Sequence, residues 1–357
     1  MNFPRLRPVL AVFLSLGFPA FSATLYVDLN SPGPVAPYSD WSTAATNIQD
    51  AVDAAGIGDI VLVTNGVYSS GGRPANGASV TNRLLVDKAI AVRSVNGPSV
   101  TIVRGNPVIG GAAVRGVYLT NGAALVGFTI TNCATRQSGD VIKDESGGGI
   151  WCAVTNGIVV SNCVIVANGA MAFGGGVYQG TLYNCVLVNN YLPPEGGAFT
   201  SPGAGGGACQ STLYNCVIRQ NRLLENMMTG GGTYNCKVFG SAIYDNFGAR
   251  EGGGAYGGML VNCTITRNTA EDCGGVAYAN LTNCIVYYNR ATNSIEDTAG
   301  HTVQSNLFGG VIRYCCTWST YYPSSFYAPN HNFTNEPVLS GMEHQALSSP
   351  CIGAGVA

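Results

Sequence analysis

The chain has 357 residues, of which only 10% are charged, and its formal net charge is −2. Nucleic acids and anionic membranes require a basic face on their partners, and this charge balance argues against both classes. The 49 glycines are about twice the average share, which favours a chain built from many tight turns.

The first 23 residues are typical of a secretory signal peptide. Arg5 and Arg7 precede an apolar run over residues 9–18, and small residues follow up to Ala23. The run is short for a membrane span, although an anchoring helix is the alternative interpretation. We therefore expect a mature chain of residues 24–357 that is secreted, periplasmic or at the cell surface, with no transmembrane segment left after signal cleavage.

Residues 24–68 predict an N-terminal cap and a first rung of strands. An amphipathic helix is expected, capped by Ser42 or Thr43, with one apolar face made of Ala44, Ile48, Ala51, Val52 and Ala55. The end of a repeat structure exposes core residues and an unpaired strand edge. This helix is therefore predicted to cover that end, and residues 83–133 are predicted to form the early, less regular rungs.

Residues 147–289 repeat a module of 17 residues that closes on asparagine and opens on glycine, except in the last copy, which opens on Cys273. Five copies have the same length, namely residues 174–190, 205–221, 230–246, 252–268 and 273–289. A sixth copy, residues 147–168, carries five extra residues, and the links between copies vary from four to fourteen residues. Fixed modules joined by variable links are typical of a solenoid.

Each module contains short alternating apolar runs broken by glycine and no apolar stripe at helical spacing. The pattern indicates strands of three to five residues. Several strands in each repeat of 21 to 31 residues predict an all-β fold in which each repeat is one turn of a parallel β-helix. Residues at the same module position then stack about 4.8 Å apart.

The modules, the opening segment of residues 26–68 and the closing SPCIGAG of residues 349–355 resemble a known family. They are similar to secreted bacterial right-handed parallel β-helix proteins of the pectate-lyase-like superfamily, with GGG-x-NC-x-I-x-x-N turns. The resemblance implies one solenoid domain over residues 24–357, with irregular closing turns over residues 290–357. It implies no single activity, because the superfamily includes lyases, hydrolases, epimerases and adhesins.

Counted from the first residue of each module, positions 4, 9, 12 and 14 are expected to point into the core. Position 14 is aliphatic, whereas position 12 is a file of cysteines: Cys163, Cys185, Cys216, Cys263 and Cys284. In-register strands hold such side chains about a strand spacing apart, which is too far for a disulfide, and a single file does not converge on a metal. We expect a stack of buried thiols.

Asparagine closes every module at position 17. Stacked amides can bond from rung to rung, and asparagine tolerates the left-handed backbone of a tight corner. We expect a structural ladder made of Asn168, Asn190, Asn221, Asn246, Asn268 and Asn289. A second line of asparagines at position 11 is expected to do the same at another corner.

Position 5 is expected to point outward next to the inward position 4. It carries four aromatic residues, Trp151, Tyr178, Tyr234 and Tyr256. Aromatic faces stack on sugar rings, so these residues are the predicted substrate-binding side chains. The alternative is that aromatic residues simply favour strands and shield glycine-rich backbone.

Positions 13 and 15 form a second outward line, which is unusually apolar for a solvent-facing sheet. Either the chain covers this line itself, with the long link of residues 191–204 as the candidate, or another protein does. We expect the link to cover it, because it is far longer than a turn requires.

Charged residues that could carry catalysis are few. The chain has no G-H-G motif, and its three histidines all follow residue 300. The gapless alignment places Arg250 and Glu251 under Glu271 and Asp272, and these four are the catalytic candidates. Stacked like charges at Glu251 and Asp272 would invite calcium or a shifted pKa, whereas Arg250 and Glu271 would form an ion pair. Solvated surface is the alternative for all four.

Two further charged groups are read as surface features. Asp245 lies under Arg267 in the alignment, which predicts an ion pair. Asp140, Asp144 and Glu145 form an acidic patch before the first glycine triplet, and solvated surface is the expectation for them.

The pattern loosens after Asn289. Cys315 or Cys316 is expected to lie near Cys351 and to form one disulfide with it, which export would permit. The chain stops two residues after SPCIGAG, so we expect either a fragment or a minimal secreted form.

The leading hypothesis is a secreted or cell-surface scaffold that binds an extracellular polysaccharide or a surface protein, with no nucleic-acid partner and no demonstrated catalysis. The resemblance implies the alternative of a polysaccharide lyase or glycoside hydrolase acting on acidic polysaccharide. An adhesin-like passenger is the third reading. No cofactor is required, and calcium is the only one for which the carboxylates offer ligands.

Overall fold

The computed structural model describes residues 22–194, 203–225, 227–293, 306–318, 330–341, 349 and 351. The predicted signal peptide therefore lies outside the described residues except for Ser22 and Ala23, and its cleavage stays a prediction. Among the described residues, no helix has both the length and the hydropathy needed to cross a membrane.

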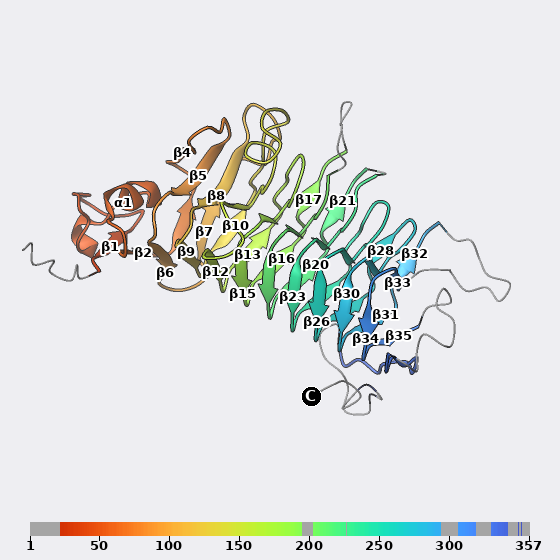
Figure 1. The fold of residues 1–357 in the computed structure, drawn as a ribbon. Coiled ribbons are helices and arrows are strands. Elements are labelled where there is room, and N and C mark those ends of the chain that lie inside the picture. Colours follow the sequence, from red (N-terminus) through yellow and green to blue (C-terminus); the bar gives the residue numbers. More distant parts are fainter. Residues whose placement is uncertain are drawn as a thin grey trace, which may run out of the picture.

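Three long sheets run side by side along the molecule, and nearly every strand pairs in parallel with the strand one turn away. This elongated coil is the predicted right-handed parallel β-helix (Figure 1). Parallel crossovers are almost always right-handed, because a right-twisted strand returns to its sheet most easily in that sense.

Sheet A contains eleven strands, which are, in spatial order, β1 (Thr24–Val27), β2 (Ile60–Val63), β6 (Ala91–Ser94), β9 (Ala124–Val126), β12 (Val159–Ser161), β15 (Thr181–Tyr183), β19 (Thr212–Tyr214), β23 (Lys237–Phe239), β26 (Met259–Val261), β30 (Asn280–Thr282) and β34 (Ile312–Arg313). Sheet B contains ten, which are β3 (Gly66–Tyr68), β7 (Thr101–Arg104), β10 (Thr129–Thr131), β13 (Val164–Val166), β16 (Val186–Val188), β20 (Val217–Arg219), β24 (Ala242–Tyr244), β27 (Thr264–Thr266), β31 (Ile285–Tyr287) and β35 (Cys316–Thr317).

Sheet C also contains ten strands, which are β33 (Leu307–Phe308), β29 (Val276–Ala277), β25 (Ala255–Tyr256), β22 (Thr233–Tyr234), β18 (Ala208–Cys209), β14 (Val177–Tyr178), β11 (Ile150–Cys152), β8 (Val114–Leu119), β5 (Thr81–Val86) and β4 (Arg73–Pro74). Among the strands of the described residues, only β4 and β5 pair antiparallel. Two short pairs lie in the links, namely β17 (Tyr191–Leu192) with β21 (Arg222–Leu223), and β28 (Thr269–Ala270) with β32 (Arg290–Ala291).

A short helix, α1 (Ile48–Ala54), lies at the N-terminal end of the coil (Figure 1). Its buried face, Ile48, Ala51 and Val52, joins the main core, as expected for a cap. The predicted capping residues are wrong, because Asn47 caps α1 by accepting a hydrogen bond from the Asp50 N–H at 2.9 Å. Ser42 and Thr43 lie instead in a 3-10 turn, Trp41–Thr43, whose N-cap is Asp40, and Ala45 then donates its N–H to the Tyr26 carbonyl in β1.

Left-handed backbone corners separate the three strands of each module. In the module of residues 174–190 they fall at Gln179, Asn184 and Asn189, with φ of 60°, 53° and 55°. Asparagine adopts this conformation more easily than most residues. Gly240 replaces the position-11 asparagine in one module and takes the same conformation, with φ of 54°.

The position-17 asparagines form a continuous buried ladder. Each Nδ2 donates to the Oδ1 of the next asparagine along the helix axis, at 2.9 to 3.1 Å from Asn168 through Asn289 to Asn306. Each amide also binds backbone: for example, Asn221 Nδ2 donates to the Leu187 carbonyl at 3.0 Å, and Asn221 Oδ1 accepts from the Asn190 N–H at 3.0 Å. The ladder therefore satisfies main-chain groups at a corner that water does not reach.

The third glycine of each triplet leaves room for this ladder. A Cβ atom at Gly207 would lie 2.5 Å from the Gly232 carbonyl oxygen and 3.0 Å from Asn221 Nδ2. The glycine triplet and the asparagine that closes the module are thus two parts of one corner.

The position-12 cysteines lie buried in a single file beside the aliphatic stack. They also serve as weak polar groups: Cys163 Sγ donates to the Ser161 carbonyl at 3.3 Å and accepts from the Phe128 N–H at 3.5 Å. Ser241 fills the same position in one module, where its Oγ accepts from the Cys216 N–H at 2.9 Å.

Part of the apolar outer face of sheet B is covered by C-terminal residues. Ile285 and Tyr287 of β31 pack in one buried cluster with Cys316 and Cys351, against Phe333 and Leu339. The link predicted to cover this face, residues 191–204, begins as β17 beside the glycine corner, and its residues 195–202 lie outside the described part of the chain.

We predict that Asn221→Ala destabilises the protein by about 3 kcal/mol, because the change leaves the Asn190 N–H and Nδ2 without their acceptor in a buried corner. Urea unfolding measures this loss. Asn184→Gly is the matched control, since this exposed asparagine has a positive φ that glycine also accepts, and it should change stability by less than about 0.5 kcal/mol. Equal losses in the two variants would contradict the role of the ladder.

Candidate functional site

The outward residues of sheet C form one register that runs the length of the coil. Successive rungs of this face carry, in pairing order, Tyr118, Trp151, Tyr178, Cys209, Tyr234, Tyr256, Ala277 and Phe308. All four aromatic residues singled out in the sequence lie in this row. Cys209 divides the row into two parts with different environments.

The first part of the row is buried. Trp151 and Tyr178 are only 8% and 4% exposed, so the prediction that all four rings face solvent is wrong for these two. The Trp151 ring stacks between Tyr118 and Tyr178, with ring centroids 5.0 Å and 6.3 Å away. Its Nε1 donates to the Ile142 carbonyl at 2.8 Å, so the link before the first triplet folds over it.

A buried arginine holds that link in place. Arg115 is fully buried, and its guanidinium donates to the carbonyls of Gly147 and Ser146 at 3.1 Å and 2.8 Å. The same group lies 5.9 Å from the centre of the Trp151 ring, a cation–π geometry. Burial lowers the pKa of Arg115 to about 9, and the nearby charge of Asp144 opposes that shift.

Two residues of the acidic patch, Asp144 and Glu145, are also buried, which contradicts the prediction of solvated surface for them, whereas Asp140 is exposed as predicted. Burial raises the pKa of Asp144, but hydrogen bonds from the Ser79 and Val80 N–H groups outweigh it, and the pKa is lowered overall. Burial raises the pKa of Glu145, and the Asp144 charge adds to the rise. Glu145 Oε2 is buried without a hydrogen-bond partner, which is consistent with the direction of this shift.

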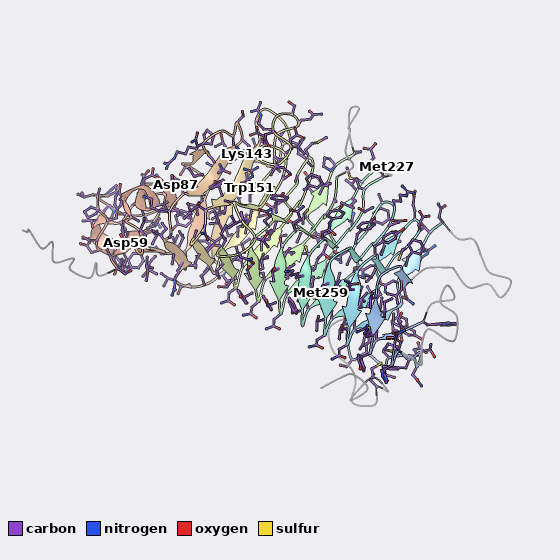
Figure 2. The ribbon with its side chains drawn as sticks, in the orientation of Figure 1. Asp59, Asp87, Lys143, Trp151, Met227 and Met259 are labelled. Carbon is purple, nitrogen blue, oxygen red and sulfur yellow. The ribbon has the colours of Figure 1, made fainter. Side chains whose placement is uncertain are left out.

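The second part of the row opens into a cleft. Tyr234 and Tyr256 are half-buried and stack on each other, with ring centroids 5.5 Å apart and planes 6° apart. The cleft has a volume of about 490 Å³ and is lined by these two tyrosines together with Phe173, Gln210, Met227, Thr229, Asn235, Arg250 and Glu251. Figure 2 labels Met227 on the edge of the coil formed by the links, and Met259 of sheet A away from that edge.

Two kinds of polar side chain flank the tyrosines. Gln210 and Asn235 come from the left-handed corner that follows sheet C, with φ of 54° and 48°. Arg250 and Glu251 come from the link on the opposite side, where Glu251 bridges to Thr229 and Cys273 on the neighbouring turns. The cleft thus combines aromatic rings, amides and one residue of each charge from segments far apart in the chain.

The register of the charged link differs from the gapless alignment. Arg250 lies beside Asp272, whose N–H donates to the Arg250 carbonyl at 2.8 Å and whose Oδ2 is 3.8 Å from Arg250 Nε. Glu271 instead bonds through its N–H to the Ala249 carbonyl, so the predicted ion pair between Arg250 and Glu271 is wrong. The shift arises because Glu251 pairs with Cys273, one residue later than the alignment assumes.

Glu251 is the carboxyl group that lines the cleft, and its environment favours the neutral form. Burial raises its pKa, the Arg250 charge offsets part of the rise, and the Asp272 charge adds to it. A carboxyl group that is protonated above its usual range can donate a hydrogen bond or a proton to a bound ligand.

The remaining charged candidates do not add to the cleft. Asp245 and Arg267 form the predicted ion pair, with Nε 2.8 Å from Oδ1. Across the described ranges, no three His, Cys, Asp or Glu side chains come together as a metal site, so the calcium role suggested for Glu251 and Asp272 stays a sequence hypothesis.

A second row of aromatic side chains was not predicted from the sequence. Tyr183, Tyr214 and Phe239 stack on the outer face of sheet A, with centroids 5.0 Å and 4.9 Å apart. All three occupy position 10 of their modules, so the signal was present in the same alignment. Arg115 was missed because nothing local in the sequence distinguishes a buried arginine from a solvated one.

We predict that the pKa of Glu251, measured by carboxyl NMR titration, lies above 4.5. Asp272→Asn should lower this pKa and Arg250→Gln should raise it further, because each removes one of the charges acting on Glu251. The fold favours the protonated form, so the stability Glu251 contributes is present below pH 4.5 and is lost as the pH rises through its raised pKa. A Glu251 pKa that neither substitution moves would contradict this environment.

Comparisons with known proteins return only distant structural likenesses. No family model matches the chain, and no curated protein matches it either. A rhamnogalacturonan lyase structure is 13% identical, with 75% of this chain and 69% of that chain covered and a TM-score of 0.40. The mannuronan C-5 epimerase AlgE4 A-module of Azotobacter vinelandii is 16% identical, with 83% and 98% covered and a TM-score of 0.39.

A third solved structure, pectin methylesterase PemA of Erwinia chrysanthemi, is 12% identical, with 83% of this chain and 90% of that chain covered and a TM-score of 0.38. Likenesses this distant carry no conclusion about what the present chain binds or does. The functional argument therefore depends on the cleft itself.

Proposed function

We propose that this protein is a glycan-binding β-helix that holds a segment of an extracellular polysaccharide in the cleft beside Tyr234 and Tyr256. The observation that carries the proposal is the convergence of two stacked tyrosines, two amides and a pair of opposite charges around one hollow of about 490 Å³. Ligand pockets are commonly about 300–1,000 Å³, with aromatic walls and few polar groups. Export of the chain, expected from residues 1–23, is part of the same proposal.

The break in the aromatic row gives a sugar ring a place to stack. The rung next to Tyr234 carries the small, fully buried Cys209, so no ring of sheet C covers that face of Tyr234. Phe173 and Gln210 line the cleft on this side. A pyranose ring stacked on Tyr234 would place its hydroxyl groups near the amides of Gln210 and Asn235, which both donate and accept hydrogen bonds.

The charged rim sets the kind of glycan that fits best. Arg250 is half-exposed, and Asp272 Oδ2 is as far as 3.8 Å from its Nε, so the guanidinium can still bind a ligand carboxylate. The raised pKa of Glu251 beside it weakens the repulsion that this carboxyl group would exert on an anionic sugar. We therefore infer a preference for polysaccharides that contain uronic acids over neutral ones.

One observation favours a catalytic role for the same cleft. The pKa of Glu251 is raised, which is the direction that a general acid needs, and Glu251 lies beside both Arg250 and the tyrosines. A polysaccharide lyase or glycoside hydrolase is therefore the second candidate function. An enzyme must form product from the polysaccharide, whereas a scaffold only has to bind and retain it.

We predict that the purified protein is retained on immobilised acidic polysaccharide and that Tyr234→Ala weakens retention by about three- to tenfold, the value of one lost aromatic stacking contact. Affinity electrophoresis in gels containing polygalacturonate, alginate or a neutral glucan measures the effect. Tyr183→Ala is the matched control, because it removes an exposed tyrosine from sheet A, outside the cleft. Equal weakening by both substitutions would place binding elsewhere.

The same polysaccharides, incubated with the protein with and without calcium, decide between the two functions. A scaffold releases neither reducing ends nor unsaturated uronates, whose double bond absorbs in the ultraviolet. Product formation that Glu251→Gln abolishes, with retention unchanged, would replace the scaffold by an enzyme. Product that survives Glu251→Gln would exclude this cleft acid as its source.

A further inference from the structure

Two adjacent cysteines near the C-terminus face opposite sides of the coil wall. Cys315 belongs to the inner file, where its Sγ accepts from the Cys284 N–H at 3.4 Å. Cys316 begins β35 and lies on the outer face of sheet B, paired with Ile285. The alternation of side chains along extended backbone explains this separation, and it distinguishes two thiols that the sequence alone leaves equivalent.

Cys351 reaches the outer face from a separate segment. It is 8% exposed and packs in one apolar cluster with Cys316, which is 1% exposed, and with the Ile285 and Tyr287 side chains. Cys316 and Cys351 therefore share one buried environment. Both also line a single cavity of about 260 Å³, which Phe333 and Tyr314 help to enclose.

We propose that Cys316 and Cys351 are an oxidisable pair that forms an intramolecular disulfide and fastens the C-terminal segment to the last turn of the β-helix. The bond would lock apolar side chains onto the outer face of sheet B near the end of the coil, where Phe333 bridges in parallel to Cys316. This site is independent of the glycan cleft.

The geometry selects this pair over the other thiols. Within the inner file, neighbouring cysteines come from in-register parallel strands and project the same way, about one strand spacing of 4.8 Å apart. A disulfide requires Cβ atoms about 3.5–4.5 Å apart. Cys351 is not part of that register, and it approaches Cys316 from the covering segment.

The chemistry is thiol–disulfide exchange with a small disulfide oxidant. One protein thiolate attacks the reagent, forms a mixed disulfide and releases one thiol; the second protein thiolate then attacks the protein sulfur and releases the other. The two cysteines lose two electrons and two protons, which the reagent carries away as two thiols. Burial raises the pKa of Cys316, and the thiolate is the attacking form, so the reaction is expected to run faster at alkaline pH.

The test uses the full-length purified protein incubated at mildly alkaline pH with 2-hydroxyethyl disulfide, followed by alkylation in denaturant and peptide mass mapping. The expected result is loss of two hydrogen atoms and a cross-linked peptide joining Cys316 to Cys351, reversed by dithiothreitol. Oxidation should raise Tm by about 5 °C, because the bond closes a long loop.

Two variants keep the result interpretable. Cys315→Ser should still form the cross-link, whereas Cys351→Ser should leave Cys316 unlinked and remove the oxidation-dependent rise in Tm. Any of three results with the protein that carries no substitution would overturn the proposal: a cross-link through Cys315, stable mixed disulfides on both Cys316 and Cys351, or no change in mass after oxidation. Peptide mapping of the protein without substitutions decides the outcome. The proposal therefore stays testable even if a variant fails to fold.

Discussion

The buried asparagine ladder is the interaction on which the rest of the structure depends. Each amide binds the next amide and two main-chain groups at a corner closed to water, so successive turns are joined by more than their strand pairing. An unsatisfied polar group at such a corner would cost about 1–3 kcal/mol, and the ladder removes that cost on every turn. It also fixes the register, because an amide displaced by one residue would lose all of these partners.

Because the modules fix the register, the links between them can vary in length and sequence. The candidate site uses residues from these variable links. The modules set the floor of the cleft, where Tyr234 and Tyr256 stack one turn apart. The links add what differs from turn to turn: Arg250 and Glu251 in one, and Met227 and Thr229 in another. At the other end of the same face, a different link covers Trp151 and holds Arg115 and Asp144 under it. One row of outward positions therefore contains both a closed and an open region.

Regular positions were predictable from the sequence, whereas link conformations were not. The cysteine file, the asparagine line and the aromatic row repeat at one module position each, so a gapless alignment was enough to place them in space. The alignment failed where the main chain changes register, which moved Asp272 beside Arg250 and left Glu271 outside the cleft. It also gave no indication that Asp144 and Glu145 are buried, because their burial depends on a distant arginine and on segments without repeats.

The central claim is that a glycan binds in the cleft beside Tyr234 and Tyr256. Hydrogen-exchange mass spectrometry of the full-length protein, with and without fragments of the retained polysaccharide, tests it most directly. The account predicts slower exchange in peptides covering residues 227–235 and 250–257 and unchanged exchange in residues 181–184 and 237–240 of sheet A. Slower exchange confined to sheet A, or none with any polysaccharide at concentrations that saturate retention, would contradict it.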